Sequence, residues 1–234
     1  RSYERQKINY NNKISYYESL GFSKQDAAVK AATIIMPPGS SEHNLGYAMD
    51  IVCVEEWFER IRHYGAERTV KIEHYIISSG LKEMIEGTKV ARNGAFERIY
   101  ASSFYYDQSG VAVWPAQVVN YTNKTQYLFR ISKGFLEEHD ERVNDSMPAS
   151  ERRIPFENMV YIGDSATDIP CMHLVKERGG YTIGVFDPIK DNREKVYKLL
   201  NDGRLTFYAP ADYTANSAMS KYLKQIIDNV ALNE

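Results

Sequence analysis

From residue 54 onward the apolar positions follow two alternating patterns, short continuous runs and runs with helical spacing. The short runs predict strands at residues 70–77, 99–104, 111–113, 159–162, 181–185 and 206–209. Helical spacing predicts helices at residues 54–61, 81–86, 125–131, 169–178, 190–201 and 219–230. Because strands alternate with helices, the pattern predicts an α/β fold with a doubly wound, mostly parallel sheet.

The first 52 residues have a different character, since they are polar and rich in Tyr, Asn and Lys. Weak helical patterns cover residues 14–20 and 24–32, Pro37-Pro38-Gly39 interrupts regular structure, and residues 45–52 predict a short strand. We therefore expect a small α+β fragment over residues 1–52, joined near residues 51–54 to an α/β part over residues 53–234. Within the second part, the charged stretch 137–153 predicts a solvated excursion.

Composition argues against two classes of protein. The net charge of −2 over 234 residues predicts no nucleic-acid-binding surface, and no stretch approaches the roughly 20 apolar residues of a membrane span. Cys53 and Cys171 lie in apolar segments without metal-like spacing, so we expect buried, reduced thiols and a reducing compartment. With no signal peptide visible after Arg1, these features favour a cytoplasmic protein.

The strongest chemical signal is Gly163-Asp164 followed by Asp168, directly after the apolar run 159–162. This order places two carboxylates at the C-terminal end of a buried strand, where open α/β sheets bind ligands. Carboxylate oxygens suit Mg²⁺, which usually takes one or two of them together with substrate phosphate oxygens. The alternative is that the two acids only cap the helix that begins at Ile169.

Two further features point to phosphate. Ser78-Ser79-Gly80 follows an apolar run and precedes a helix, so a hydroxyl and backbone N–H groups form a possible phosphate cradle, with a simple helix cap as the alternative. Lys124 opens a helix after a loop, where its ammonium adds to the preference of a helix N-terminus for anions. The alternative for Lys124 is an ordinary exposed lysine.

Taken in this order, the three features resemble motifs two, three and four of bacterial haloacid-dehalogenase-like (HAD) hydrolases, over about residues 53–234. The resemblance implies a Rossmannoid sheet and a small phosphorylated substrate. It also implies that Ser78, with Ser79 and Gly80, binds the transferred phosphoryl group and that Lys124 neutralises it. Asp164 would ligate Mg²⁺, and Asp168 would complete or orient the metal shell.

One part of the HAD pattern is absent. HAD enzymes attack phosphate with an aspartate of an Asp-x-Asp-x-Thr motif at the end of a central first strand, and this chain contains no Asp-x-Asp. Without that carboxylate the covalent aspartyl-phosphate route is closed, so we expect turnover near zero. The sheet is then incomplete, and either residues 45–52 take the place of the first strand or the chain is poorly stable.

The N-terminal part carries a different motif, in which His43 on a loop precedes Asp50 on the predicted strand. Such a pair is half of a catalytic zinc site, which normally has three protein ligands. The surrounding residues resemble VanY-type D-alanyl-D-alanine carboxypeptidases over residues 1–52. That resemblance implies that His43 and Asp50 bind Zn²⁺ and that Arg1 binds the carboxylate of a D-Ala-D-Ala peptide. The family's Trp-His pair is missing, so the zinc site is incomplete.

Three functional hypotheses remain open. The first is a HAD-type, magnesium-dependent phosphatase scaffold with little or no activity, which accounts for most of the length. The second is a zinc D-Ala-D-Ala carboxypeptidase whose C-terminal half has been replaced. The third is a non-catalytic phosphate- or Mg²⁺-binding protein, or a chimera of two hydrolase fragments.

Overall fold

The computed structural model describes residues 3–27, 51–188 and 193–233, with side chains placed from residue 11 to 27 and from residue 56 onward in those ranges. The chain divides into two compact units, Arg1–Val54 and Glu55–Glu234, which are described separately. In the first unit, helix α1 (Tyr3–Ser19) begins well before the predicted residue 14. The second predicted helix is present over residues 24–27 and otherwise lies outside the described residues.

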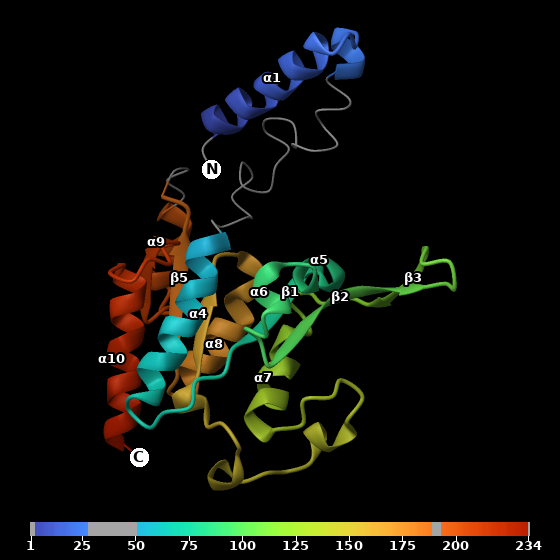
Figure 1. Ribbon diagram of the computed structural model, residues 1–234. Helices are drawn as coiled ribbons and strands as arrows, with labels where there is room; N and C mark the ends of the chain where they lie inside the picture. Colours follow the sequence, from blue (N-terminus) through green and yellow to red (C-terminus); the bar gives the residue numbers. More distant parts are fainter. Residues whose placement is uncertain (1–2, 28–50, 189–192, 234) are drawn as a thin grey trace. The chain divides into compact units, whose positions relative to one another are not determined.

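The second unit alternates strands with helices, as the sequence predicts (Figure 1). Its strands are β1 (Tyr75–Leu81), β2 (Arg98–Tyr106), β3 (Ala112–Gln117), β4 (Val160–Gly163), β5 (Tyr181–Phe186) and β6 (Phe207–Pro210). Its helices are α4 (Ile51–Ala66, which begins before the unit boundary), α5 (Lys82–Glu86), α6 (Lys89–Arg92), α7 (Lys124–Lys133), α8 (Ile169–Glu177), α9 (Arg193–Asn201) and α10 (Ala218–Asn233). The predicted mixed α/β character is therefore confirmed.

Within the described residues the strands form two three-stranded sheets, an arrangement consistent with the predicted single sheet that lacks its central strand. In one, β4, β5 and β6 are all parallel, with Ile162 opposite Ile183. In the other, β1 is parallel to β2, and β2 is antiparallel to β3. Among the described residues, β1 and β4 each have a single neighbouring strand, so the backbone ladder stops at both.

The predicted strand at residues 45–52 was expected to take the place of the missing first strand of the sheet, and its two described residues do not. Residues 51 and 52 belong to helix α4, which contradicts the prediction for them, and residues 45–50 lie outside the described part of the chain. The proposed zinc ligands His43 and Asp50 also lie outside the described residues, as does Arg1.

Strand β5 forms the centre of the parallel sheet and is buried along almost its whole length. Helices α4 and α10 contribute Trp57, Ile61 and Met219 to an apolar cluster with Ile183. A second cluster contains Met172 of α8 together with other side chains of α7, α8 and α9. A strand covered in this way is buried on both faces and reads as a continuous apolar run, which explains why its sequence predicted it accurately.

The first strand starts later than predicted. Residues 70–74 are not in a strand, and β1 runs on to Leu81, which was expected to begin a helix. The apolar side chains of Val70 and Ile72 pack instead in the cluster that contains Trp57 and Ile61. Their apolar character therefore reflects contact with helices and not pairing in a sheet.

The charged stretch 137–153 is mostly exposed and none of its residues is buried, which confirms the prediction of a solvated excursion, but hydrogen bonds hold its backbone against the second unit. Arg130, buried on α7, donates hydrogen bonds to the carbonyl oxygens of residues 137, 138 and 140. Lys133 donates to the carbonyls of residues 143 and 145, and Arg153 pairs with Glu73. Cations on a neighbouring helix thus satisfy the backbone of a segment that has short 3₁₀ turns and few apolar residues.

His74 is an unusual component of the packing in this unit. Its ring lies 4.7 Å from that of Phe58 and 6.1 Å from that of Trp57, measured between centroids. Both of its ring nitrogens are buried without a hydrogen-bond partner. Burial, and then the charge of Arg62, lowers the pKa of His74 to about 4.

This lowered pKa predicts that stability falls as the pH falls from 6.5 toward 4. The unfolded chain takes up a proton at His74 near pH 6.5, while the folded chain resists until about pH 4. At 1.36 kcal/mol for each pKa unit, the loss is about 3 kcal/mol. Urea unfolding between pH 6.5 and 4.5 measures it, and this range lies above the region in which Glu73, with its pKa lowered to about 2, contributes.

The matched variant is His74→Phe, which keeps a ring against Trp57 and Phe58 but cannot be protonated. We expect it to lose most of the pH dependence in that range. An unchanged pH dependence in His74→Phe would show that other groups cause the acid sensitivity.

Candidate functional site

The candidate site lies at the C-terminal end of β4, where the chain turns through Ser165 and a short 3₁₀ turn (Ala166–Asp168) into α8. Ser165 and Asp168 form a capping box, in which the side-chain oxygen of each residue accepts a hydrogen bond from the backbone N–H of the other. Pro170 lies in the first turn of α8. The sequence thus forms a tight, fixed connection that directs the Asp168 carboxylate back toward the strand end.

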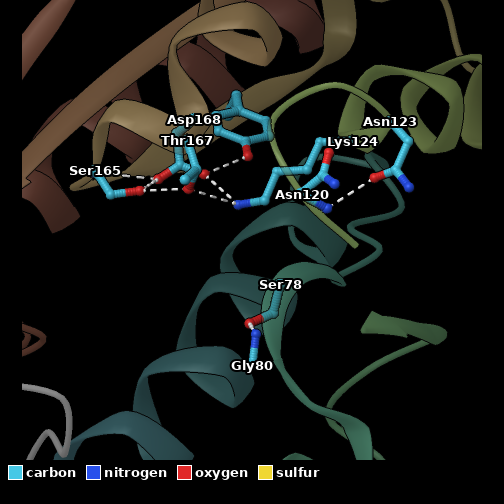
Figure 2. A network of polar contacts seen from close by, with 9 residues as sticks. Ser78, Gly80, Asn120, Asn123, Lys124, Ser165, Thr167 and Asp168 are labelled. Carbon is cyan, nitrogen blue, oxygen red and sulfur yellow. Dashed lines mark hydrogen bonds and ion pairs between the residues drawn. The ribbon is translucent and has the colours of Figure 1, made fainter. Parts of the chain in front are cut away.

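The centre of the site is a buried ion pair between Lys124 and Asp168, which join the start of α7 to the start of α8 (Figure 2). Lys124 Nζ lies 2.7 Å from Asp168 Oδ1, and the two side chains are 5% and 9% exposed. The Tyr161 hydroxyl donates to the same oxygen at 2.8 Å. Oδ2 accepts from the hydroxyl and the backbone N–H of Ser165, at 2.8 and 3.2 Å. Lys124 also donates to Thr167 Oγ1 at 3.4 Å.

The electrostatics of this cluster keep the Asp168 carboxyl ionised. Burial alone would raise the pKa of Asp168, but the charge of Lys124 and the hydrogen bonds to the carboxylate hold its pKa below the usual value. Burial and the nearby Asp168 carboxylate raise the pKa of Tyr161, which therefore remains a neutral donor. The predicted alternative of an exposed Lys124 is wrong, because this side chain is almost completely buried.

Asp164 differs from Asp168 in its surroundings. It is exposed at the end of β4, whereas Asp168 is buried. Partial desolvation and the negative charge of Asp168 raise the pKa of Asp164, and Lys124 and Lys195 oppose this rise. Of the two acids, Asp164 is the one that an external ligand can reach.

These surroundings determine how a magnesium ion would fit. Both oxygens of Asp168 already accept hydrogen bonds, so Asp168 orients its neighbours and is not available as a ligand. Within the described ranges, no cluster of three or more His, Cys, Asp or Glu side chains could hold a metal by itself. An Mg²⁺ ion at this strand end would have Asp164 as its exposed carboxylate ligand, and phosphate and water oxygens would have to supply the other ligands.

Ser78 lies apart from this network (Figure 2). Its hydroxyl accepts a hydrogen bond from the Gly80 N–H at 3.0 Å and so closes a local turn at the end of β1. The N-cap of helix α5 is Leu81, so Ser78 is not the helix cap that the alternative interpretation predicted. Ser79 and Gly80 are exposed, and a phosphate-binding role for the three residues stays a prediction.

The loop before α7 is shaped by two asparagines (Figure 2). Asn123 Oδ1 accepts from the Asn120 N–H at 2.8 Å, and Asn123 Nδ2 donates to the carbonyl of Val118 at 2.7 Å. These bonds fix the point at which the helix begins and hence the position of Lys124. This role of the two asparagines has no counterpart among the sequence-based predictions.

Sequence reasoning also missed the residues that surround the two acids. The role of Tyr161 could have been predicted, because a tyrosine within an apolar strand indicates a buried hydroxyl that needs a hydrogen-bond partner. Two other neighbours of Asp164 come from distant segments, and no sequence pattern points to them: Lys195 of α9 and Tyr213. Burial and the charge of Asp164 raise the pKa of Tyr213 to about 12.

Comparison with known proteins identifies the family of this chain. The family model for haloacid dehalogenase-like hydrolases (HAD) matches residues 4–173. The chain belongs to this family. The HAD match begins at residue 4 and so includes most of the segment in which we expected a separate peptidase-like fragment. The carboxypeptidase resemblance of residues 1–52 stays a prediction.

A relative of this HAD-like chain is an uncharacterised protein of Borreliella burgdorferi. The two are 30% identical over 169 residues, which cover 67% of this chain and 58% of the relative. The HAD-like chain therefore spans less than two thirds of that protein's length. In the described parts of the chain, no helix is both long enough and apolar enough to cross a membrane.

The buried pair predicts a large effect of removing its cation. Lys124→Met leaves the Asp168 carboxylate buried without its counter-charge, and breaking a buried ion pair in this way typically costs about 3–5 kcal/mol. Urea unfolding measures the change. Lys71→Met is the matched control, because Lys71 is 78% exposed and its partner Glu73 keeps the donors Arg153 and Tyr75, so we expect a loss of about 1 kcal/mol or less. Equal losses in the two variants would contradict the structural role given to Lys124.

Proposed function

We propose that this chain is a magnesium-dependent scaffold for binding phosphate esters, of the HAD hydrolase type, with turnover near zero. The observation that carries the proposal is the buried Lys124–Asp168 pair, which joins two phosphate-handling motifs beside the exposed Asp164 at one strand end. Membership of the HAD-like hydrolase family supports the hydrolase scaffold. The phosphate ligand, the magnesium ion and the low turnover are the proposal.

Each residue has a distinct task in this proposal. Asp164 would hold Mg²⁺ together with phosphate oxygens, and the bound ion would neutralise negative charge on the ligand. The ammonium of Lys124 adds positive charge at the same strand end, and Lys195 adds more from α9. Asp168 holds Lys124 in place, and Tyr161 and Ser165 satisfy the remaining capacity of its carboxylate.

The low turnover follows from the missing nucleophile. Phosphoryl transfer to the enzyme needs a side chain that attacks phosphorus, and the family's aspartate has no counterpart, because the chain contains no Asp-x-Asp. Loss of a nucleophile typically lowers the rate by several orders of magnitude, while binding groups retain only a small residual effect. The scaffold would therefore bind phosphate esters without cleaving them at an appreciable rate.

Binding of inorganic phosphate tests the first part of the proposal. Calorimetric titration of the full chain should show binding that strengthens when Mg²⁺ is added. Asp164→Asn should lose most of this strengthening, by about tenfold or more in affinity, because the exposed carboxylate is removed. The control is Asp202→Asn, which removes an equally charged, exposed carboxylate on another part of the surface. Absence of phosphate binding with and without Mg²⁺ would contradict the proposal.

Hydrolysis of p-nitrophenyl phosphate tests the second part. We expect the rate with Mg²⁺ to match that of a sample without protein. Robust turnover that Asp164→Asn abolishes would show an active phosphatase with a nucleophile outside the Asp-x-Asp pattern.

A further inference from the structure

Most of the large apolar side chains that are exposed in the described residues gather between residues 81 and 121. Many of them belong to β2, β3 and the turn between these strands, which extend away from the remainder of the second unit (Figure 1). We call residues 103–117 the aromatic arm. Monomeric proteins seldom expose contiguous apolar patches of more than a few hundred Å², and larger ones mark interaction surfaces.

The two most exposed aromatic side chains of the aromatic arm stand opposite each other. Tyr105 on β2 pairs in register with Trp114 on β3, and these side chains are 63% and 70% exposed. Since paired residues of an antiparallel ladder project on the same side, the two rings form one aromatic face. A two-stranded hairpin is marginally stable in water without a covering layer, so this face has reason to be covered.

The charge of the aromatic arm indicates what covers it. Between residues 99 and 123, Asp107 is the sole charged residue. Its carboxylate accepts three hydrogen bonds within its own turn, from the Ser109 N–H, the Ser109 hydroxyl and the Val111 N–H. Glu83 of α5 also reaches the arm, where its carboxylate accepts a hydrogen bond from the Phe104 N–H. The arm's own surface therefore carries a single negative charge, in the turn, and no cluster of charges that would attract an acidic or basic partner. In a two-fold contact centred on Tyr105 and Trp114, such a surface can lie against its copy with little like-charge repulsion.

The size of the surface is also suitable. A large aromatic side chain covers about 150–250 Å², so the exposed parts of Tyr105, Trp114 and Tyr121, together with those of Val111 and Val113, offer on the order of 500 Å². Two copies would bury about 1,000 Å² in total, the size of a small specific interface. Pro115, near the middle of β3, has no N–H to donate and interrupts pairing along the outer edge of the strand. Contact through the aromatic face is thus favoured over edge-to-edge pairing.

We propose that the aromatic arm is a homodimer contact, in which the Tyr105–Trp114 face of one chain packs against the same face of a second copy. The contact is isologous, because each arm provides the same residues to the other. It is independent of phosphate binding, since neither Tyr105 nor Trp114 contacts the Lys124–Asp168 network.

Light scattering of the full chain over a range of concentrations tests this contact. The wild-type mass should rise from 26.9 kDa toward twice that value. Trp114→Glu places two charges against each other across the two-fold axis, so we expect dimer dissociation to shift to concentrations at least tenfold higher. Leu232→Glu is the matched control, because Leu232 is an 84% exposed apolar residue on α10, and it should dimerise like the wild type. Tyr105→Glu gives an independent test should Trp114→Glu fail to fold.

Iodide quenching of tryptophan fluorescence identifies the covering group. Trp57 is 4% exposed, so quenching reports mainly on Trp114. In the wild type, quenching should weaken as the concentration rises and the dimer forms. Two results would overturn the proposal: a monomer in which Trp114 is quenched at every concentration, or a monomer in which it is protected at every concentration because another part of the same chain covers it. A dimer that Trp114→Glu leaves unchanged would also overturn it.

Discussion

The buried pair of Lys124 and Asp168 is the interaction on which the arrangement of this protein most depends. It connects α7, which follows the strands of the first sheet, with α8, which follows strand β4 of the second sheet. It does so where the backbone ladders of the two sheets do not meet. A buried charge is costly unless it is paired and hydrogen-bonded, and here Tyr161 and Ser165 complete the pairing. The same contact that joins the two sheets also sets the position of the cation next to Asp164.

This double role explains why the two aspartates of one motif act differently. Asp168 lies in the low-dielectric interior, where four donors hold it as an anion and remove its capacity to bind a ligand. Asp164 lies outside that interior and keeps its oxygens available to solvent. One carboxylate thus organises the site and the other faces the ligand, a division that their spacing alone does not reveal.

Much of the second unit could be predicted from sequence, and the failures have physical reasons. Strands β4, β5 and β6 lie within about one residue of their predicted positions, because buried parallel strands are continuous apolar runs. The start of strand β1 was predicted too early, because the apolar side chains of Val70 and Ile72 pack against helices and do not belong to a strand. The packing of residues 137–153 depends on bonds from Arg130 to carbonyl oxygens, and carbonyls are present at every residue, so no pattern marks them.

The candidate site was predictable in its residues but not in its contacts. Lys124, Asp164 and Asp168 were identified from their places at the ends of predicted elements. Their different burial could not be inferred, because it depends on how α7 packs on α8. The N-terminal hypothesis about His43 and Asp50 concerns residues outside the described part of the chain and stays a prediction.

The separation of the sheets between β1 and β4 has a consequence for how the second unit loses its structure. In a continuous sheet, backbone hydrogen bonds couple neighbouring strands, so the strands open together. Here the two sheets are coupled through side chains. Tyr100 of β2 stacks on Tyr127 of α7, with 4.5 Å between the ring centroids, and both belong to an apolar cluster that also contains Tyr161 of β4. Amide protons of the two sheets should therefore exchange with solvent as two groups with different protection, the second unit behaving as two foldons within one compact body.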